Sequence, residues 1–153
     1  MPRVVNGIDE LKALIGSEAG VSGWHTVTQP QIDTFADLSG DHQWIHVDPE
    51  RARSESPYGV PIAHGFLTVS LLSAMIEEAI SLRGEFKLRI NYGFNRLRFP
   101  NAVPAGSRIR AHFTVNAVKA IEGGVEIAWG VLIEIEGQSK PALAAEWLDR
   151  SYF

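Results

Sequence analysis

Segment 63–80, AHGFLTVSLLSAMIEEAI, has apolar residues in almost every direction around a helix. Only at Glu77 and Glu78 does this segment turn polar. A helix that is apolar nearly all round is buried in its protein. The pattern therefore predicts one long helix at the centre of the fold.

From Glu85 onward the pattern has a period of two. Apolar residues alternate with polar ones over residues 109–117, 125–135 and 143–147, which is typical of strands with one buried face. Two glycine-containing segments, 123–124 and 136–138, supply the hairpin turns. A buried helix followed by long antiparallel strands indicates an α+β fold, in which one curved sheet wraps around the helix.

A second helix is expected to begin at Thr28. Gln31 lies three residues after Thr28, as in a capping box. Ile32 and Phe35 then share one face of the helix. This helix leads the chain directly into residues 39–48, SGDHQWIHVD, so that stretch should start where the helix ends.

Residues 39–48 hold two of the five histidines and two aspartates. Asp48, followed by proline, should cap a further helix, so the stretch is expected to be a loop, where functional groups are often placed. One interpretation is a metal site of His42 and His46 with Asp41 or Asp48, although ligands four residues apart converge only on a helix. A second is a polar loop, in which Asp41 caps a turn and His46 is a satisfied, half-buried histidine.

The third interpretation is a catalytic pair of Asp41 and His46. The Ser-Gly-Asp turn aims the carboxylate, and a return turn brings the imidazole beside it. Groups with reference pKa values of about 3.9 and 6.5 can hold one water and exchange protons with it. Such a pair also needs a place where negative charge can develop on the substrate.

That place is expected at Ala63-His64-Gly65. Gly65 stands at the start of the buried helix, where the first amides lack intrahelical acceptors and the helix dipole is positive. A carbonyl bound to the Gly65 N–H would have its enolate stabilised, as in an oxyanion hole. The alternative is that Gly65 only relieves crowding between helix and sheet and that His64 only caps the helix.

Composition narrows the class of protein further. The 153 residues are enough for a single domain, residues 1–153, whose core needs no disulfide or metal. The chain has no cysteine, which excludes thiol nucleophiles and favours a reducing, cytoplasmic location. A net charge of −4 with dispersed cations does not suit nucleic acid. The apolar stretch 65–80 is too short and too polar to cross a membrane.

Residues 35–52, FADLSGDHQWIHVDPERA, followed by residues 62–73, IAHGFLTVSLLS, resemble the MaoC-like, or R-specific, enoyl-CoA hydratase family. The chain matches the family pattern at Phe35, Gly40, Asp41, Ile45, His46 and Ala52. Gln43-Trp44 stand where Asn-Pro is usual, which resembles a short, single-domain subgroup. This departure bears on the substrate more than on the chemistry.

The resemblance implies a hot-dog fold and a homodimer or assembly of dimers, with active sites near the subunit interface. It implies reversible hydration of trans-2-enoyl-CoA to (R)-3-hydroxyacyl-CoA, with Asp41 as the base, His46 as its proton partner and Gly65 as the oxyanion donor. Ser73 matches a serine that hydrogen-bonds near the aspartate, and His64 is a supporting residue. No metal or redox cofactor is implied, and coenzyme A is only part of the substrate.

Two other functions would share this fold. An acyl-CoA thioesterase would direct the water at the carbonyl carbon, and a non-catalytic acyl-thioester-binding subunit would not need Asp41 and His46 together. The joint presence of these two residues favours hydration. Candidates for holding the phosphates of coenzyme A are three arginines, for which ordinary surface or interface roles are the alternative: Arg89, Arg96 and Arg98.

Overall fold

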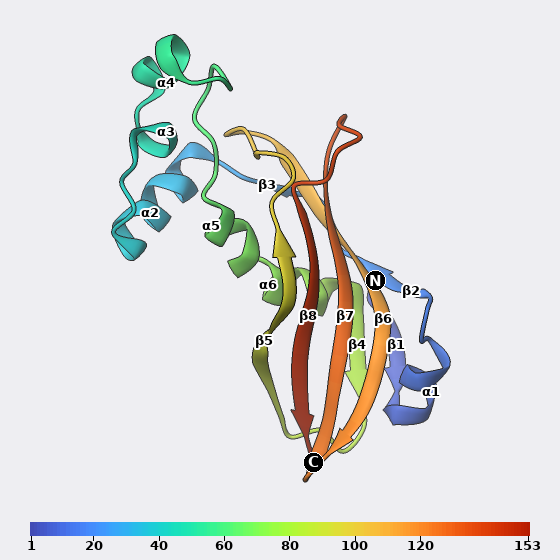
Figure 1. Cartoon of the computed structure of the whole chain (residues 1–153). Coiled ribbons are helices and arrows are strands. Elements are labelled where there is room, and N and C mark those ends of the chain that lie inside the picture. The colour runs from blue at the N-terminus through green and yellow to red at the C-terminus, as the bar shows by residue number, and fades with distance from the viewer.

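The computed structural model describes residues 1–153, which form an antiparallel sheet packed against helices (Figure 1). The six-stranded sheet has the order β2-β6-β7-β8-β5, and β3 also pairs with β6. Its strands are β2 (Glu18–Val21), β3 (His25–Thr26), β5 (Leu88–Arg98), β6 (Arg108–Ile121), β7 (Gly124–Ile135) and β8 (Leu143–Tyr152). The expected α+β fold with a curved antiparallel sheet is confirmed.

Six helices accompany the sheet: α1 (Gly7–Ala13), α2 (Gln29–Ser39), α3 (Trp44–Val47), α4 (Pro49–Glu55), α5 (Gly65–Ser70) and α6 (Leu72–Ala79). A separate parallel pair joins β1 (Arg3–Asn6) to β4 (Ile80–Arg83). The alternating pattern did not predict this pair, because each of its strands has only four residues.

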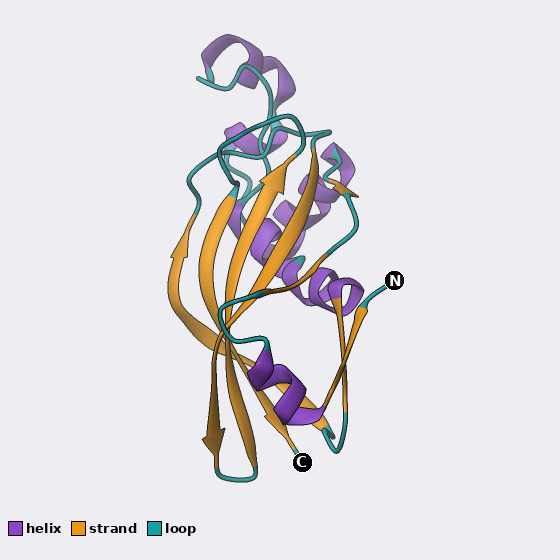
Figure 2. Ribbon diagram, turned by 90° about the vertical axis from the view of Figure 1, so that its right-hand side faces the viewer, coloured by secondary structure: helices purple, strands orange, loops and turns teal.

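The core lies between the inner, concave face of the sheet and helices α5 and α6. Alternate residues of β6, including Ile109 and Phe113, are fully buried, and they pair with Ile135 and Val131 of β7. Side chains of α6, such as Met75, belong to the same hydrophobic cluster. Figure 2 shows the strands curving along one side of the helices. The period of two therefore identified the strands and their buried face.

The predicted single long helix is wrong in one respect, because the chain forms two helices that meet at Leu71. The hydroxyl of Ser70 donates to the carbonyl of Leu67 at 2.6 Å, and the amide of Leu71 is shared between the carbonyls of Leu67 and Thr68 at 3.3 Å each. The Ser70 hydroxyl and the shorter-range bond to Thr68 compete with the regular bond from Leu71 to Leu67. The side chain of Phe66 is also 71% exposed, so one face of this apolar segment is open to solvent.

Residues 37–61 form an excursion outside the core. Helix α2 has the predicted capping box, with hydrogen bonds between Thr28 and Gln31 in both directions, and it ends at Gly40, whose φ of 77° is left-handed. The stretch expected to be all loop contains the single turn α3. Figure 1 shows α3 and α4 protruding beyond the sheet, and no residue of 37–61 belongs to the hydrophobic core cluster.

His112 of β6 links the edge strand β2 to the centre of the sheet. Its Nδ1 lies 2.9 Å from Glu18 and its Nε2 lies 2.8 Å from Glu134. Burial alone would lower the pKa of His112, but the hydrogen bonds to Glu134 and Glu18 outweigh it and raise the pKa above 6.5. The protonated ring is therefore favoured by folding.

We expect the His112 contribution to stability to be lost at alkaline pH. A raised folded pKa stabilises the protein fully below the unfolded pKa, and the effect disappears as pH rises through the folded pKa. Melting temperatures of wild type and His112→Gln should be compared from about pH 5.5 to 8.5. The wild type should melt a few degrees higher at the acidic end, and the difference should disappear as pH rises, since each kcal/mol shifts Tm by about 2–4 °C at this chain length. A Tm difference that stays constant across this range would contradict the assignment.

Candidate active site

Asp41 follows the left-handed turn at Gly40 and points one carboxylate oxygen toward His46. Its Oδ1 accepts a hydrogen bond from the amide of Gln43 at 3.3 Å. Its amide donates to the hydroxyl of Ser39 at 3.3 Å. These contacts form the tight turn that the sequence predicted, and they leave Oδ2 for other partners.

His46 lies on α3 and is 6% exposed. Its Nδ1 lies 2.7 Å from the carbonyl oxygen of Ile62, which can only accept, so this nitrogen carries the proton. Its Nε2 lies 4.0 Å from Oδ2 of Asp41. That distance is too long for a direct hydrogen bond and suits one water that contacts both groups.

Electrostatics keep the His46 ring neutral. Burial lowers the pKa of His46 below 6.5, the neighbouring His64 lowers it further, and the hydrogen bond to Ile62 and the charge of Asp41 act in the opposite direction. A neutral ring with its proton on Nδ1 has a free lone pair on Nε2. The nitrogen that faces Asp41 can therefore accept a proton.

His64 packs against both of these residues. Its Nε2 donates to the backbone carbonyl of Asp41 at 2.9 Å, and its ring stacks on the His46 ring with centroids 3.8 Å apart. The side chain makes no capping hydrogen bond to α5, so the interpretation that His64 only caps the helix is wrong. Its position next to Gly65 was the sole hint of this role in the sequence.

Gly65 is the first residue of α5, and its amide points from a helix end without an intrahelical acceptor. A Cβ built on Gly65 would lie 2.9–3.1 Å from ring atoms of Phe99, the residue that follows β5, so glycine does relieve crowding where α5 meets the end of that strand. Gly65 also borders a cavity of about 190 Å³, which is lined by His46, Tyr58, Ile62, Ala63, Gly65, Thr68, Phe99, Asn101, Ala102, Val103 and Ala142.

The structure does not bring Ser73 to Asp41. Ser73 is exposed on α6, and no hydrogen bond joins its hydroxyl to the aspartate. The reason is the orientation of α6, which turns Leu72, Met75 and Ile76 into the core. The supporting role expected for Ser73 is therefore not seen within one chain.

The metal set considered from the sequence is not assembled either. His42 is exposed and bonds Asp37 at 2.8 Å, and Asp48 caps α4 by accepting from the amide of Arg51. Asp41, His46 and His64 do place one ligand atom each within 4.8 Å of one another. The two imidazoles are stacked at an interplanar angle of 23°, so their in-plane lone pairs do not converge on one ion.

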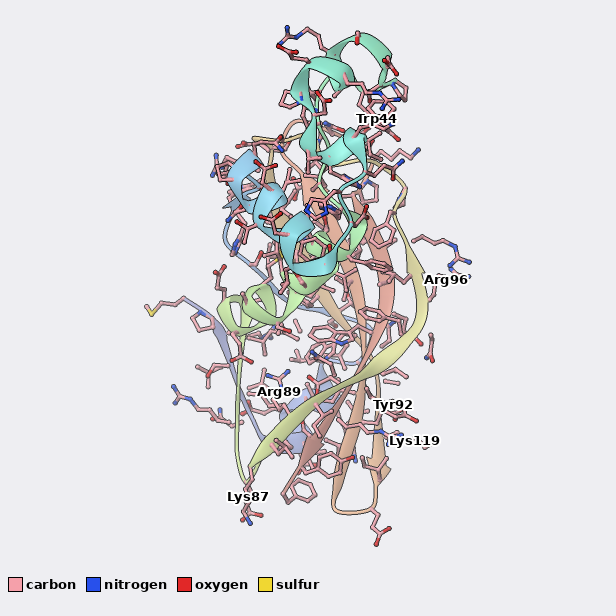
Figure 3. All side chains as sticks on the ribbon, turned by 90° about the vertical axis from the view of Figure 1, so that its left-hand side faces the viewer. Trp44, Lys87, Arg89, Tyr92, Arg96 and Lys119 are labelled. Carbon is pink, nitrogen blue, oxygen red and sulfur yellow. The ribbon has the colours of Figure 1, made fainter.

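The three candidate arginines differ in their contacts. Arg89 bonds Asp149, which is 2% exposed, and also Glu77 at 2.8 Å. Arg98 is exposed and donates to the carbonyl of Leu97. Arg96 is exposed and extends away from β5, whereas Arg89 lies nearer the middle of the fold (Figure 3). Arg89 is thus committed to carboxylates, whereas Arg96 forms no ion pair and borders a hollow on the outer face of the sheet, next to Glu146.

A larger hollow of about 820 Å³ lies on the outer face of the sheet, away from the Asp41–His46 pair. Its carboxylates already accept hydrogen bonds from neighbouring side chains. Glu146 accepts from Asn95 and Asn116, and Glu134 accepts from Arg110 and contacts His112. The smaller cavity is the better candidate for an active site, because His46 and Gly65 both line it.

The fold and this site define a hot-dog protein with a histidine–aspartate pair beside a helix N-terminus. Residues 10–134 match the family described as MaoC like domain. The chain therefore belongs to the MaoC-like dehydratase family, and the expected resemblance and hot-dog fold are confirmed.

Individual relatives agree with this assignment. The chain is 44% identical over 149 residues to 3-hydroxyacyl-thioester dehydratase Z of Mycobacterium tuberculosis, covering 97% of each chain. It is 43% identical over 147 residues to nodulation protein N of Rhizobium meliloti, covering 95% and 91%. It is 25% identical to the R-hydratase PhaJ1 of Pseudomonas aeruginosa, with a TM-score of 0.67 over 90% and 81% of the two chains. No helix of this chain has the length and apolarity to span a membrane.

Proposed function

We propose that the chain catalyses the reversible hydration of trans-2-enoyl thioesters to (R)-3-hydroxyacyl thioesters. The observation that carries this proposal is the 4.0 Å gap between Nε2 of His46 and Oδ2 of Asp41, next to the cavity that the amide end of α5 borders. Such a gap holds one water, and the helix end supplies a hydrogen bond for a carbonyl. The dehydratase and hydratase names of its relatives support the same reaction class.

In the proposed reaction, the thioester carbonyl accepts a hydrogen bond from the Gly65 N–H, which makes the β-carbon electrophilic. The water donates to Asp41 and His46, its oxygen bonds to the β-carbon, and one of its protons moves to Nε2 of His46. The enolate then takes that proton at the α-carbon, so that one water has been added and both side chains are restored. Asp41 orients the water and stabilises the imidazolium.

This division of roles differs from the sequence-based expectation, in which Asp41 was the base. Nε2 of His46 is held unprotonated, because Nδ1 donates to Ile62 and burial lowers the ring's pKa. A neutral imidazole is a competent general base near neutral pH. The proposed chemistry requires no metal or redox cofactor, and coenzyme A enters only with the substrate.

We also propose that two copies of the chain associate through β5. This strand is at the end of the sheet, so one of its edges is unpaired, and it exposes Leu88, Ile90 and Tyr92 by 54%, 45% and 54%. An open edge with apolar side chains favours pairing with another strand. Arg96 of the same strand is the candidate for a phosphate of coenzyme A.

The purified protein should hydrate crotonyl-CoA and a medium-chain enoyl-CoA. The measurement is loss of the enoyl-thioester absorbance, with chiral analysis of the product. An (R)-3-hydroxyacyl product supports the proposal. Release of free thiol would instead identify a thioesterase, and binding without turnover, also with an acyl-carrier-protein substrate, would identify a non-catalytic acyl-thioester-binding subunit.

A further inference from the structure

His64 contacts both members of the catalytic pair but does not border the cavity. Its Nε2 lies 2.9 Å from the backbone oxygen of Asp41. Its ring stacks on His46 at 3.8 Å and meets the Phe35 ring with centroids 5.0 Å apart. The residue is 2% exposed, and it is absent from the cavity lining that includes Gly65. It can therefore influence the reaction only through other residues.

The backbone of His64 also carries the third part of the site. The amide of Gly65 belongs to the peptide bond that follows His64, and the carbonyl of His64 accepts from the amide of Thr68 in the first turn of α5. Any movement of this residue would shift the oxyanion donor relative to Asp41 and His46. An enoyl thioester is planar and conjugated, so within either planar conformer, s-cis or s-trans, the distance from its carbonyl oxygen to its β-carbon is fixed. The water site and the oxyanion donor must keep a matching separation.

We propose that His64 is a positioning residue that fixes the separation between the Asp41–His46 water site and the Gly65 amide, an inference that rests on the proposed hydration. The Asp41 carbonyl can only accept a hydrogen bond, so Nε2 of His64 is a protonated donor. Its Nδ1 is buried without a partner. The hydrogen-bonding capacity of this side chain is thus directed at one contact, which holds the Asp41 loop.

Two amide variants separate this role from simple packing. His64→Gln places an N–H at nearly the reach of the imidazole Nε2, whereas His64→Asn is one methylene shorter and cannot reach Asp41. Both variants lose the stacked ring, so the difference between them reports the hydrogen bond. We expect His64→Gln to keep kcat within about tenfold of wild type and His64→Asn to lower it by about 10²-fold, the usual effect of a misplacement of about 1 Å.

The KM should stay near the wild-type value in both variants, because His64 does not touch the cavity. Equal losses of kcat in the two variants, or a rise in KM with kcat intact, would overturn the proposal. Melting temperatures, recorded alongside, identify any variant that has lost its fold.

A second measurement does not depend on turnover. In NMR spectra of isotope-labelled protein, the ring N–H of His64 should exchange slowly with water. Both variants should show the small amide shifts caused by loss of the ring, and His64→Asn should shift the backbone amides of residues 40–43 well beyond the change seen in His64→Gln. If the wild type hydrates no enoyl thioester, the proposed function fails, and these amide shifts alone decide whether His64 positions the loop. Unchanged amides in His64→Asn would refute the positioning role.

Discussion

Asp41→Asn and His46→Gln should each lower kcat for hydration by about 10²–10⁴-fold, the usual contribution of a positioned acid–base group. The asparagine retains the turn made by Oδ1 but places no negative charge beside the water. The glutamine is uncharged and of similar length, but it has no basic nitrogen to replace Nε2. Because the two residues act on the same water, the double variant should be little worse than either single variant.

The matched control is His42→Gln. This histidine belongs to the same ten-residue stretch, but it is exposed and bonds only Asp37, so its loss should leave kcat close to the wild-type value. Hydration that survives both Asp41→Asn and His46→Gln would eliminate the proposed pair. In the wild type, kcat/KM should fall on acidification only below about pH 6.5, because the pKa of His46 in the free protein is lowered and its neutral form is the active one.

Gly65→Pro should lower kcat by about 10²–10³-fold beyond Gly65→Ala, which is the usual effect of removing one oxyanion-hole donor. Position 65 is the first residue of α5, where proline is favoured. The preceding His64 already has φ −60° and ψ 138°, a conformation that suits a residue before proline. The substitution therefore deletes the amide hydrogen with little strain on the backbone.

Gly65→Ala is the control for this substitution. Both variants add a Cβ that meets the Phe99 ring at 2.9–3.1 Å, but alanine retains the amide hydrogen. The comparison of kcat and kcat/KM between the two variants isolates the hydrogen bond from the displacement of Phe99. If alanine and proline variants lose the same activity, the Gly65 N–H does not stabilise the enolate.

The sheet and the capped helix α2 followed from local patterns in the sequence. Alternation over residues 109–117 and 125–135 identified β6 and β7, because one face is buried along β7 and along the first half of β6. Thr28 and Gln31 identified the start of α2 through side-chain contacts three residues apart. The turn at Gly40 and the proximity of Asp41 to His46 are also local, since the two residues are five positions apart in the sequence.

The contacts that the sequence did not disclose are long-range or too short to form a pattern. The stacking of His64 on His46 joins residues that an irregular segment separates, and no periodicity specifies where that segment returns. The break at Leu71 depends on a hydroxyl of Ser70 that turns back to the helix, which an apolar helical pattern conceals. The ion pair of Arg89 with Asp149 joins residues 60 positions apart.

The excursion of residues 37–61 places Asp41 and His46 outside the hydrophobic core cluster. The hydrophobic core cluster draws on residues before and after this segment and on none within it. Substitutions at the exposed positions of α3, α4 and the following turn should therefore change the free energy of unfolding little. Most proteins must trade stability for new activity. Here Asp41, His46 and Tyr58 lie in a segment that the core cluster does not use, whereas Ala63, Val103 and Ala142 belong to both the cavity and the core cluster.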